Sequence, residues 1–570
     1  MNSKSRNVSA GFPGIRDFIL LGIVWTLAIF LVNPTGNFPL NDDWIYAFTV
    51  EKCLLEGKLH FLNWASTRAY PHVFIGIISC FLFGFSQEVL RFSTILLGFA
   101  GILTTYALLK QAEEPKQKQT IPLLGALLLA VNPIYLELSN TFMTDVPFYV
   151  VFVTSVYYFS RFLKNNSNRD LWLGTGWACL AIAYRQFGIV APLAFSATLL
   201  FRKIKPRRNI LMILAPALCA IGVFWFINQS YGGVDPTAPM KYHGYWDHFL
   251  RPDIAGNALY LLKICIAYSG LFFLPLLIFI TSKIIAQSSG NKIMPSLFIL
   301  SLVAVAGVWW GAGGENWMPF AKNIGNIMTP WGLGPFPLKG NAGGFFSSLA
   351  AHPVFWSGVT VFSFFGAVLF LFFCIRAAWQ TFYPVNDGKP SDGNRLFAAL
   401  MMLIYFLILV FFPQFYDRYL LVFFPSVFMI LSLQTVNNAA QPLKNARKIS
   451  WVGFLILAVM GIFSVAGTHD YLWLNRTRWK ATQELMEKEK ISPERIDGGY
   501  EFNGHFLYHE KYQPTNKTSW WWVDRDDYVI ALRPLKENGY EHLRSYEYPR
   551  WLFLSPERVL ILKKMEAVDA

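Results

Sequence analysis

The sequence predicts an all-α polytopic membrane protein of about thirteen transmembrane helices that ends in a small extracytoplasmic α+β domain. Hydrophobic residues make up 54% of the 570 residues and charged residues only 15%, whereas soluble domains carry about a quarter charged residues. The apolar residues fall in blocks of roughly 17 to 25, the length of a helix that crosses a bilayer. One globular core could not bury such a surplus, so a multi-pass membrane protein is expected.

The distribution of Lys and Arg predicts how the chain is oriented. These residues give a net charge of +14, but they occur in short clusters between apolar blocks, so insertion topology explains them better than nucleic acid does. By the positive-inside rule these linkers face the cytoplasm together with the N-terminus; they lie at 110–119, 161–169, 202–208, 283–292, 376–395 and 444–448. The six cysteines show neither a disulfide framework nor a metal-binding spacing.

Thirteen spans fit between these linkers and place the N-terminus inside and the C-terminus outside. They are 17–33 (interpreted as a retained anchor), 92–110, 120–136, 146–163, 171–184, 186–201, 209–227, 257–281, 294–310, 353–375, 396–412, 419–434 and 450–467. The apolar segment 71–85 is too short for a full crossing, so we interpret it as a re-entrant or interfacial helix in the first outer loop, 34–91. The short pair 171–184 and 186–201 could instead form one broken hairpin.

The chain is expected to divide into a membrane domain, 1–467, and an extracytoplasmic soluble domain, 468–570. The second part is less hydrophobic. It begins with a helix-like stretch and continues in short alternating segments punctuated by Gly, Asn and Pro, which is typical of a small α+β domain. The stretch "WWWVDRDD" (520–527) is expected to form an aromatic packing surface followed by a turn, rather than a metal site.

Two adjacent acids, Asp42 and Asp43, stand at the start of the first outer loop. One interpretation is an N-cap, because helically spaced apolar residues follow and Gly57 provides a stop. A cap needs only one acid, and adjacent like charges are unfavourable without a partner. Paired carboxylates at a membrane surface therefore also suit a general base or a divalent-cation site. No other cofactor is predicted.

Two arginines on the outer side are candidates for binding phosphate. Arg185 is flanked on both sides by apolar helix, where a charge needs an anion or a polar cavity. It could form a structural pair with a carboxylate such as Asp145 or Asp417, or it could grip phosphate through two parallel hydrogen bonds. Arg418 lies at the outer end of a span, where interfacial anchoring or a second phosphate contact explains it.

Several further residues on the outer side are candidates with supporting roles. Asp145 precedes a span with Pro147 in its first turn, so helix capping is its main alternative. In the first outer loop, Arg68 is a further candidate for binding phosphate, and Tyr70 and His72 lie close to it in sequence. Tyr419 directly follows Arg418 and is a fourth candidate.

The order of short motifs along residues 15 to 430 resembles the GT-C superfamily of integral-membrane glycosyltransferases. The likeness is strongest to the branch of protein O-mannosyltransferases and lipid A aminoarabinose transferases. It rests on the acidic pair followed by Tyr46 and Ala47, then "LLEG", Pro71 opening an apolar segment that ends in "LFG", "EVLR", "TDVPF", "AIAYRQFG" and "DRYLLVFFP". Two positions depart from the branch: Tyr70 stands where the aminoarabinose transferases carry Lys, and Arg185 replaces the usual lysine.

This resemblance implies an inverting transfer of a hexosyl or pentosyl group from a polyprenyl-phosphate donor to a lipid, glycan or protein acceptor hydroxyl. Asp42 or Asp43 would be the base, and Arg185, Arg418 and Arg68 would bind the donor phosphate. It also implies a multi-pass protein of a bacterial inner (plasma) membrane, with the site and the C-terminus extracytoplasmic. Two alternatives stay open. A transporter or lipid flippase usually shows an inverted repeat, and a polysaccharide ligase or polymerase would use a lipid-diphosphate donor.

Overall fold

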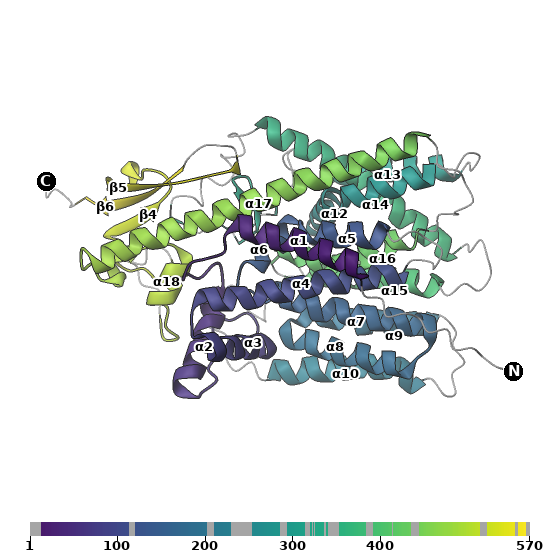
Figure 1. Cartoon of the computed structure of the whole chain (residues 1–570), viewed down its shortest axis with the longest axis horizontal. Coiled ribbons are helices and arrows are strands. Elements are labelled where there is room, and N and C mark those ends of the chain that lie inside the picture. The colour runs from purple at the N-terminus through teal and green to yellow at the C-terminus, as the bar shows by residue number, and fades with distance from the viewer. Residues whose placement is uncertain are drawn as a thin grey trace.

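Long apolar helices packed side by side form most of the protein, and a small sheet lies beyond one end of them (Figure 1). The computed structural model describes residues 13–112, 120–201, 210–229, 253–285, 293–313, 320–321, 323, 325–335, 338–339, 353–382, 391–412, 414–434, 444–512, 521–552 and 557–565. Residues 230–252, most of residues 314–352 and parts of the basic linkers lie outside this range.

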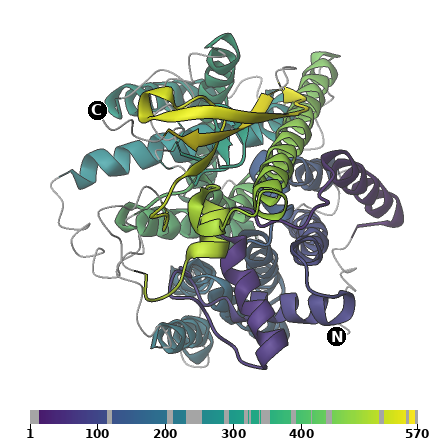
Figure 2. The ribbon, with the colours of Figure 1, turned by 90° about the vertical axis from the view of Figure 1, so that its left-hand side faces the viewer.

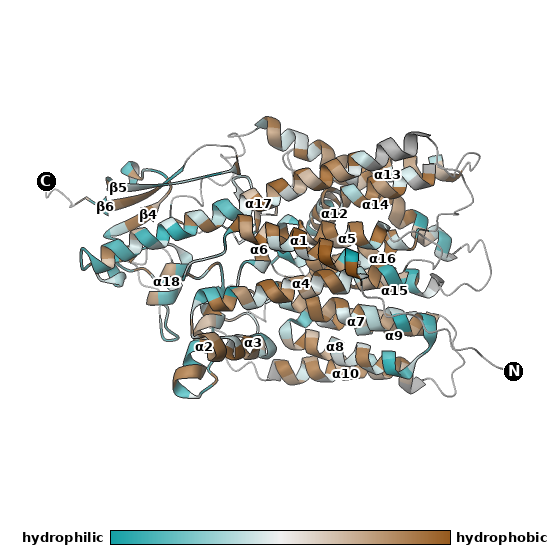
Figure 3. Cartoon of the chain, in the orientation of Figure 1, coloured by the Kyte–Doolittle hydropathy of each residue, from teal (hydrophilic) through white to brown (hydrophobic). Residues whose placement is uncertain are grey.

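Eight of the described helices are long and apolar enough to cross a membrane. They are α1 (Ile15–Val32), α4 (Gln87–Ala112), α7 (Asp145–Asn165), α12 (Ile254–Ile285), α13 (Ile293–Gly311), α14 (Pro353–Phe382), α15 (Ser391–Phe411) and α17 (Lys444–Glu487). Figure 3 shows hydrophobic residues dominating the packed helices, whereas hydrophilic residues gather toward both ends. The predicted all-α membrane fold is thus confirmed.

A ninth span arises if α5 (Thr120–Ala130) and α6 (Pro133–Ser139), which meet at 58°, count as one. The bend has a local cause. The Asn132 side chain accepts hydrogen bonds from the N–H groups of Ile134 and Tyr135, and Pro133 occupies the first turn. This cap starts a new helix instead of continuing the old one.

The other predicted spans coincide with helices that do not meet this criterion over the residues searched, so the number thirteen stays a prediction. These are α8 (Asn168–Tyr184), η1 (Gln186–Ile189) with α9 (Val190–Phe201), α10 (Ile210–Gln229), and η4 (Asp417–Phe423) with α16 (Phe424–Ser432). The first outer loop holds α2 (Asp43–Glu56) and α3 (Tyr70–Phe83). With only 14 residues and an exposed Phe81, α3 is compatible with the interfacial helix expected at 71–85.

Two described basic residues of the predicted linkers bind carbonyl groups at the ends of neighbouring helices. The Lys164 ammonium at the end of α7 contacts the Gln111 carbonyl at the end of α4. Arg395, near the start of α15, donates to the Leu433 carbonyl beyond α16 at 3.0 Å. These contacts join α7 to α4 and α15 to the end of α16 at positions that border the predicted inner linkers, and the orientation of the chain stays a prediction.

The C-terminal residues form a four-stranded sheet carried by α17. This 44-residue helix runs through the predicted boundary at residue 467 and extends beyond the other helices (Figure 1). The strands follow the order β3 (Ile496–Asp497), β4 (Tyr528–Ala531), β6 (Glu557–Lys564) and β5 (Tyr540–Tyr548), and only the β3–β4 pair is parallel. The remaining short elements are η5 (Pro493–Arg495), α18 (Tyr500–Leu507), η6 (Lys536–Asn538) and a hairpin of β1 (Met328–Thr329) and β2 (Gly332–Leu333).

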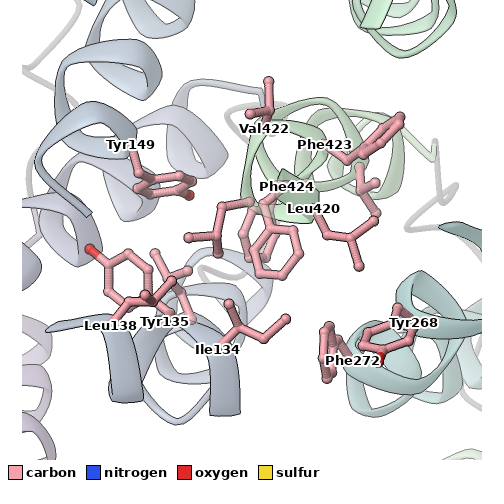
Figure 4. Close-up of a cluster of buried hydrophobic side chains, with 14 of the residues drawn as sticks. Ile134, Tyr135, Leu138, Tyr149, Tyr268, Phe272, Leu420, Val422, Phe423 and Phe424 are labelled. Carbon is pink, nitrogen blue, oxygen red and sulfur yellow. The ribbon is translucent and has the colours of Figure 1, made fainter. Parts of the chain in front are cut away.

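A buried apolar cluster fixes the helix ends that carry the polar residues of interest (Figure 4). It joins α6, α7, α12 and the η4–α16 segment through Ile134, Tyr135, Leu138, Tyr149, Tyr268, Phe272, Leu420, Val422, Phe423 and Phe424. Two of its tyrosines are also hydrogen-bonded: the Tyr135 hydroxyl donates to the Gly98 carbonyl at 2.7 Å, and the Tyr149 hydroxyl lies 2.8 Å from the Thr105 hydroxyl. Close packing with paired polar groups holds η4 rigidly against α6 and α7.

Candidate active site

Four helix ends meet at the sheet-bearing end and bring charged side chains together. Asp42 directly precedes α2, Asp145 opens α7, Arg185 follows α8, and Arg418 is the second residue of η4. The Arg185 guanidinium forms an ion pair with Asp145 Oδ1. Arg418 lies between two carboxylates, with Nε 4.0 Å from Asp145 Oδ1 and Nη2 3.4 Å from Asp42 Oδ2. The structure thus unites four residues that are spread over 376 positions of the sequence.

Burial differs among these four side chains and decides which of them a substrate can reach. Asp145 is 3% exposed, Arg418 7% and Arg185 12%, whereas Asp42 is 25% exposed. Water therefore screens the two arginines and Asp145 only weakly, which strengthens their mutual attraction. Asp42 is the carboxylate most accessible from outside.

Each arginine also lies against an aromatic ring. The Arg418 guanidinium is 4.4 Å from the centre of the Tyr416 ring, and that of Arg185 is 5.1 Å from the centre of the Tyr419 ring. Such stacking fixes the plane of a guanidinium while leaving its edge free to donate. Two nitrogens of Arg418, Nε and Nη1, are buried without a hydrogen-bond acceptor. An anion at this position would satisfy donors that the protein leaves unpaired.

Asp42 occupies the N-cap position of α2, but its carboxylate does not cap the helix. It instead accepts a hydrogen bond from the Tyr500 hydroxyl at 2.7 Å and faces Arg418. The geometry therefore does not support capping as the reason for this acid.

Asp43 is buried beneath Asp42 and lies in a different environment. Its Oδ2 accepts from the Leu40 N–H at 3.3 Å. Burial raises the pKa of the Asp43 carboxyl to about 7, and nearby backbone N–H groups and Arg91 offset this only in part. The Arg91 guanidinium donates to the carbonyls of Gly36 and Phe38 and so orders the loop before α2. Asp43 therefore belongs to the support of this loop.

The predicted supporting residues of the first outer loop divide into two groups. Thr67, next to Arg68, donates to the Tyr184 carbonyl at 3.1 Å, so the half-buried Arg68 belongs to a loop that packs beside Arg185. His72 is buried, with Nε2 3.0 Å from the Phe142 carbonyl and its ring stacked on Phe142. Tyr70 packs edge-on against Phe61. The contacts of His72 and Tyr70 favour packing roles.

Three further residues belong to this region: Asp417, which the sequence suggested only as a partner of Arg185, and Tyr500 and Glu501, which it did not suggest. The Asp417 carboxylate accepts from the N–H groups of Ile327 and Met328 at 2.9 and 2.7 Å, which ties a distant loop to η4. From the C-terminal part of the chain, Tyr500 reaches Asp42, and Glu501 reaches the backbone N–H of the preceding residue, Asn41. No local motif marks Tyr500 or Glu501, because their role depends on contacts across hundreds of positions.

An open groove of about 730 Å³ lies next to the charged cluster. It is lined by Asp253, Gly256, Asn257, Tyr260, Leu261, Ala312, Ala321, Asn323, Gln414 and Phe415. Tyr416 separates this groove from Arg418: its hydroxyl donates to Gln414 at 3.1 Å, while its ring carries the guanidinium. A substrate held in the groove would therefore lie one side chain away from the arginines.

Few of the described side chains near Asp42 and Asp43 could act as ligands of a metal ion. Within the described ranges, no group of three or more His, Cys, Asp or Glu side chains is arranged to hold one. Asp42 already faces a guanidinium and a phenol, and Asp43 is buried with a raised pKa. These surroundings do not fit a divalent cation bound by the acidic pair.

Comparison with known proteins gives one family match. Residues 71–228 match the model of the dolichyl-phosphate-mannose-protein mannosyltransferase family. No curated protein matches the chain significantly.

Solved structures give distant likenesses at 14% identity. ArnT from Cupriavidus metallidurans bound to undecaprenyl phosphate has a TM-score of 0.35, with 85% of this chain and 81% of that chain covered. The Archaeoglobus fulgidus oligosaccharyltransferase in complex with Zn and sulfate has a TM-score of 0.39, with 88% and 59% covered. At this level the likeness defines no correspondence between individual residues. The family match, which includes Asp145 and Arg185, confirms the predicted resemblance to the GT-C integral-membrane glycosyltransferases.

Proposed function

We propose that this protein is an inverting glycosyltransferase that moves a sugar from a polyprenyl-phosphate carrier to an acceptor hydroxyl at the outer face of the membrane. The observation that carries the proposal is the position of Arg418. This buried guanidinium has unpaired donors and lies between the partly exposed Asp42 and the buried Asp145. A cation for a leaving phosphate and a carboxylate for an incoming hydroxyl are therefore adjacent.

The arginines would bind the phosphate of the donor. Arg185 and Arg418 both approach Asp145 Oδ1, so their guanidinium groups converge on one carboxylate oxygen. A phosphate beside them could accept hydrogen bonds from the Arg418 nitrogens that have no acceptor in the protein. As the bond to the sugar breaks, this phosphate gains charge, and cations that are already oriented stabilise it without reorganisation.

Asp42 would accept the proton of the acceptor hydroxyl. It is the more exposed of the two adjacent acids, and its carboxylate is held from one side by Tyr500. In the proposed step the acceptor oxygen attacks the anomeric carbon, the bond from that carbon to the phosphate oxygen breaks, and the proton passes to Asp42. Asp43 supports the loop from beneath and stays out of contact with substrate.

The resting geometry requires one local rearrangement. A direct displacement places the incoming and leaving oxygens on opposite faces of the anomeric carbon, so the sugar must lie between the base and the phosphate site. Arg418 Nη2 and Asp42 Oδ2 are only 3.4 Å apart, which leaves no room for a sugar ring. Donor binding would therefore separate this pair, and the phosphate would replace Asp42 as a partner of Arg418.

Placement at the outer face follows from the arrangement of charge along the chain. The cluster lies at the end of the helices opposite the contacts of Lys164 and Arg395. If the basic linkers are cytoplasmic, the cluster and the C-terminal sheet are extracytoplasmic. A lipid carrier suits this side because its tail remains in the bilayer while the phosphosugar reaches the polar end of the helices.

The test is transfer by the purified protein in lipid nanodiscs, with a synthetic polyprenyl-phosphate sugar compared with the matching diphosphate. Mass analysis of a mixture of lipid, glycan and peptide acceptors would identify the product. We expect turnover with the monophosphate only, and a fall of roughly 10²-fold or more in Asp42→Asn. Asp524→Asn is the matched control, because Asp524 also accepts from a tyrosine hydroxyl, that of Tyr512, away from the cluster. Turnover with the diphosphate alone would support a ligase or polymerase, and full activity of Asp42→Asn would exclude it as the base.

A further inference from the structure

The C-terminal part of the chain contacts Asp42 and the residue before it through two consecutive residues of α18. The Tyr500 hydroxyl donates to Asp42 Oδ1 at 2.7 Å, and Glu501 Oε1 accepts from the Asn41 N–H at 3.0 Å. Figure 2 looks onto this end of the molecule and shows the tail elements lying over it. Two adjacent positions of the first outer loop are thus held by two adjacent positions of the tail.

The orientation of the Tyr500 hydroxyl is determined by a second partner. Trp64 Nε1 donates to the Tyr500 oxygen at 3.0 Å, so this oxygen accepts from Trp64 and directs its own proton to Asp42. The ring is buried and packs against Trp44, Trp521 and Trp522 at 6.1, 4.9 and 5.7 Å between ring centres. Neither the ring nor the hydroxyl can turn away without breaking these contacts.

The backbone before Asp42 is held as firmly. Asn41 adopts a left-handed conformation with φ of 53°, which a non-glycine residue keeps only when its surroundings enforce it. Its N–H is bound by Glu501, whose other oxygen accepts from the buried Arg478 at 2.9 Å. Glu501 therefore sets the path of the backbone into Asp42, and Tyr500 sets the direction of its side chain.

We propose that Tyr500 is a positioning residue that orients the Asp42 carboxylate for proton transfer, so that the C-terminal part of the chain completes the active site. The inference rests on the proposed function. The two oxygens of Asp42 have separate partners: Tyr500 holds Oδ1 and Arg418 faces Oδ2. When the sugar separates Arg418 from Asp42, Tyr500 is the contact that keeps Oδ1 in place and leaves Oδ2 to receive the proton.

The test is a double-mutant cycle between Tyr500→Phe and Asp42→Asn. Phe keeps the ring and its packing but removes the hydrogen bond. We expect Tyr500→Phe to lower kcat by roughly 10-fold or more while donor affinity stays unchanged, because a hydrogen bond to a charged group is lost but the arginines are not. In the Asp42→Asn background the same change should cause no further loss, because no base remains to be oriented.

Tyr512→Phe is the matched control. Tyr512 belongs to the same buried aromatic cluster, and its hydroxyl donates to Asp524 at 3.2 Å rather than to the active site. This variant should keep wild-type kcat. Equal losses from Tyr500→Phe in the presence and absence of Asp42 would show a merely structural role and overturn the inference, as would wild-type kcat in Tyr500→Phe. If Asp42→Asn alone retains full activity, the proposed base is wrong; a low rate in Asp42→Asn with a normal rate in Tyr500→Phe refutes this inference alone.

Discussion

Variants of Arg185 and Asp145 can show whether Arg185 only forms a structural ion pair with Asp145 or also binds the donor phosphate. Both side chains are buried, at 12% and 3% exposure. Removing one partner of a buried pair costs about 3–5 kcal/mol, because a charge is left without compensation. Asp145 would retain Arg418 Nε at 4.0 Å, so we expect Arg185→Gln to cost about 3 kcal/mol, the lower end of this range.

The discriminating experiment adds Asp145→Asn and the double variant. Two neutral amide side chains leave no uncompensated charge, so the double variant should regain most of the stability lost by Arg185→Gln. Donor affinity should not return, because the guanidinium that binds phosphate is still absent. Arg185→Lys should retain a measurable fraction of activity, since the charge survives without the two-point geometry.

Two measurements on each variant decide the question: the thermal unfolding midpoint in nanodiscs, and equilibrium binding of the polyprenyl-phosphate sugar. We expect stability and affinity to separate, with only stability restored in the double variant. If donor affinity recovers together with stability, or if Arg185→Gln unfolds the protein without changing affinity, Arg185 serves only to pair with Asp145. The assignment of Arg185 to the phosphate would then be wrong.

Three further predictions concern the acidic loop, its contact with the tail, and topology. Burial raises the pKa of Asp43 to about 7 in the folded protein, whereas the pKa of an unfolded Asp is 3.8. Between these two pH values the folded state binds the proton more tightly, so the free energy of unfolding falls as the pH rises, by about 4 kcal/mol at most. Thermal midpoints measured from pH 4 to 8 should therefore fall less steeply in Asp43→Asn, and parallel curves would contradict the burial argument. Glu501→Gln leaves the buried Arg478 unpaired, so hydrogen exchange of the Asn41 amide should accelerate by roughly 100-fold; an unchanged rate would show that Glu501 does not hold the loop. A reporter that is active only outside the cytoplasm should be active when fused after Ala570, and activity of a cytoplasmic reporter there would reverse the topology.

Local sequence patterns were sufficient to predict most of the helices. Apolar blocks of spanning length identify α1, α4, α12 and α14, because the bilayer imposes a length that the sequence must meet. The break between α8 and α9 was harder, since it depends on one extended residue, Arg185, with φ of −153°. The continuation of α17 through residue 467 is not evident from the sequence, because the change from apolar to polar residues there is typical of the end of a membrane-spanning helix.

The sequence indicates individual residues of the candidate site but not how they are arranged in space. Charges beside apolar helix are conspicuous in a sequence because they need partners, which is why Asp42, Arg185 and Arg418 were found. The pair of Arg185 with Asp145 is among the alternatives that the sequence suggests. The contact of Asp42 with Arg418 is not, since it joins residues 376 positions apart. Tyr500 carries no such signal: a tyrosine in a polar tail has many ordinary roles, and only the fold brings it to Asp42.

The charges of the cluster explain how the base and the phosphate site would act together. Arg185 and Arg418 balance Asp42 and Asp145, so the group of four is formally neutral before the donor binds. In the proposed reaction, proton transfer neutralises Asp42 in the same step that adds negative charge to the departing phosphate. Because the bound sugar would already have separated Arg418 from Asp42, the guanidinium faces the phosphate alone and stabilises its growing charge at low effective dielectric. Separation of the resting Arg418–Asp42 pair, 3.4 Å apart, would therefore free the guanidinium for the leaving phosphate and the carboxylate for the proton of the acceptor at the same time.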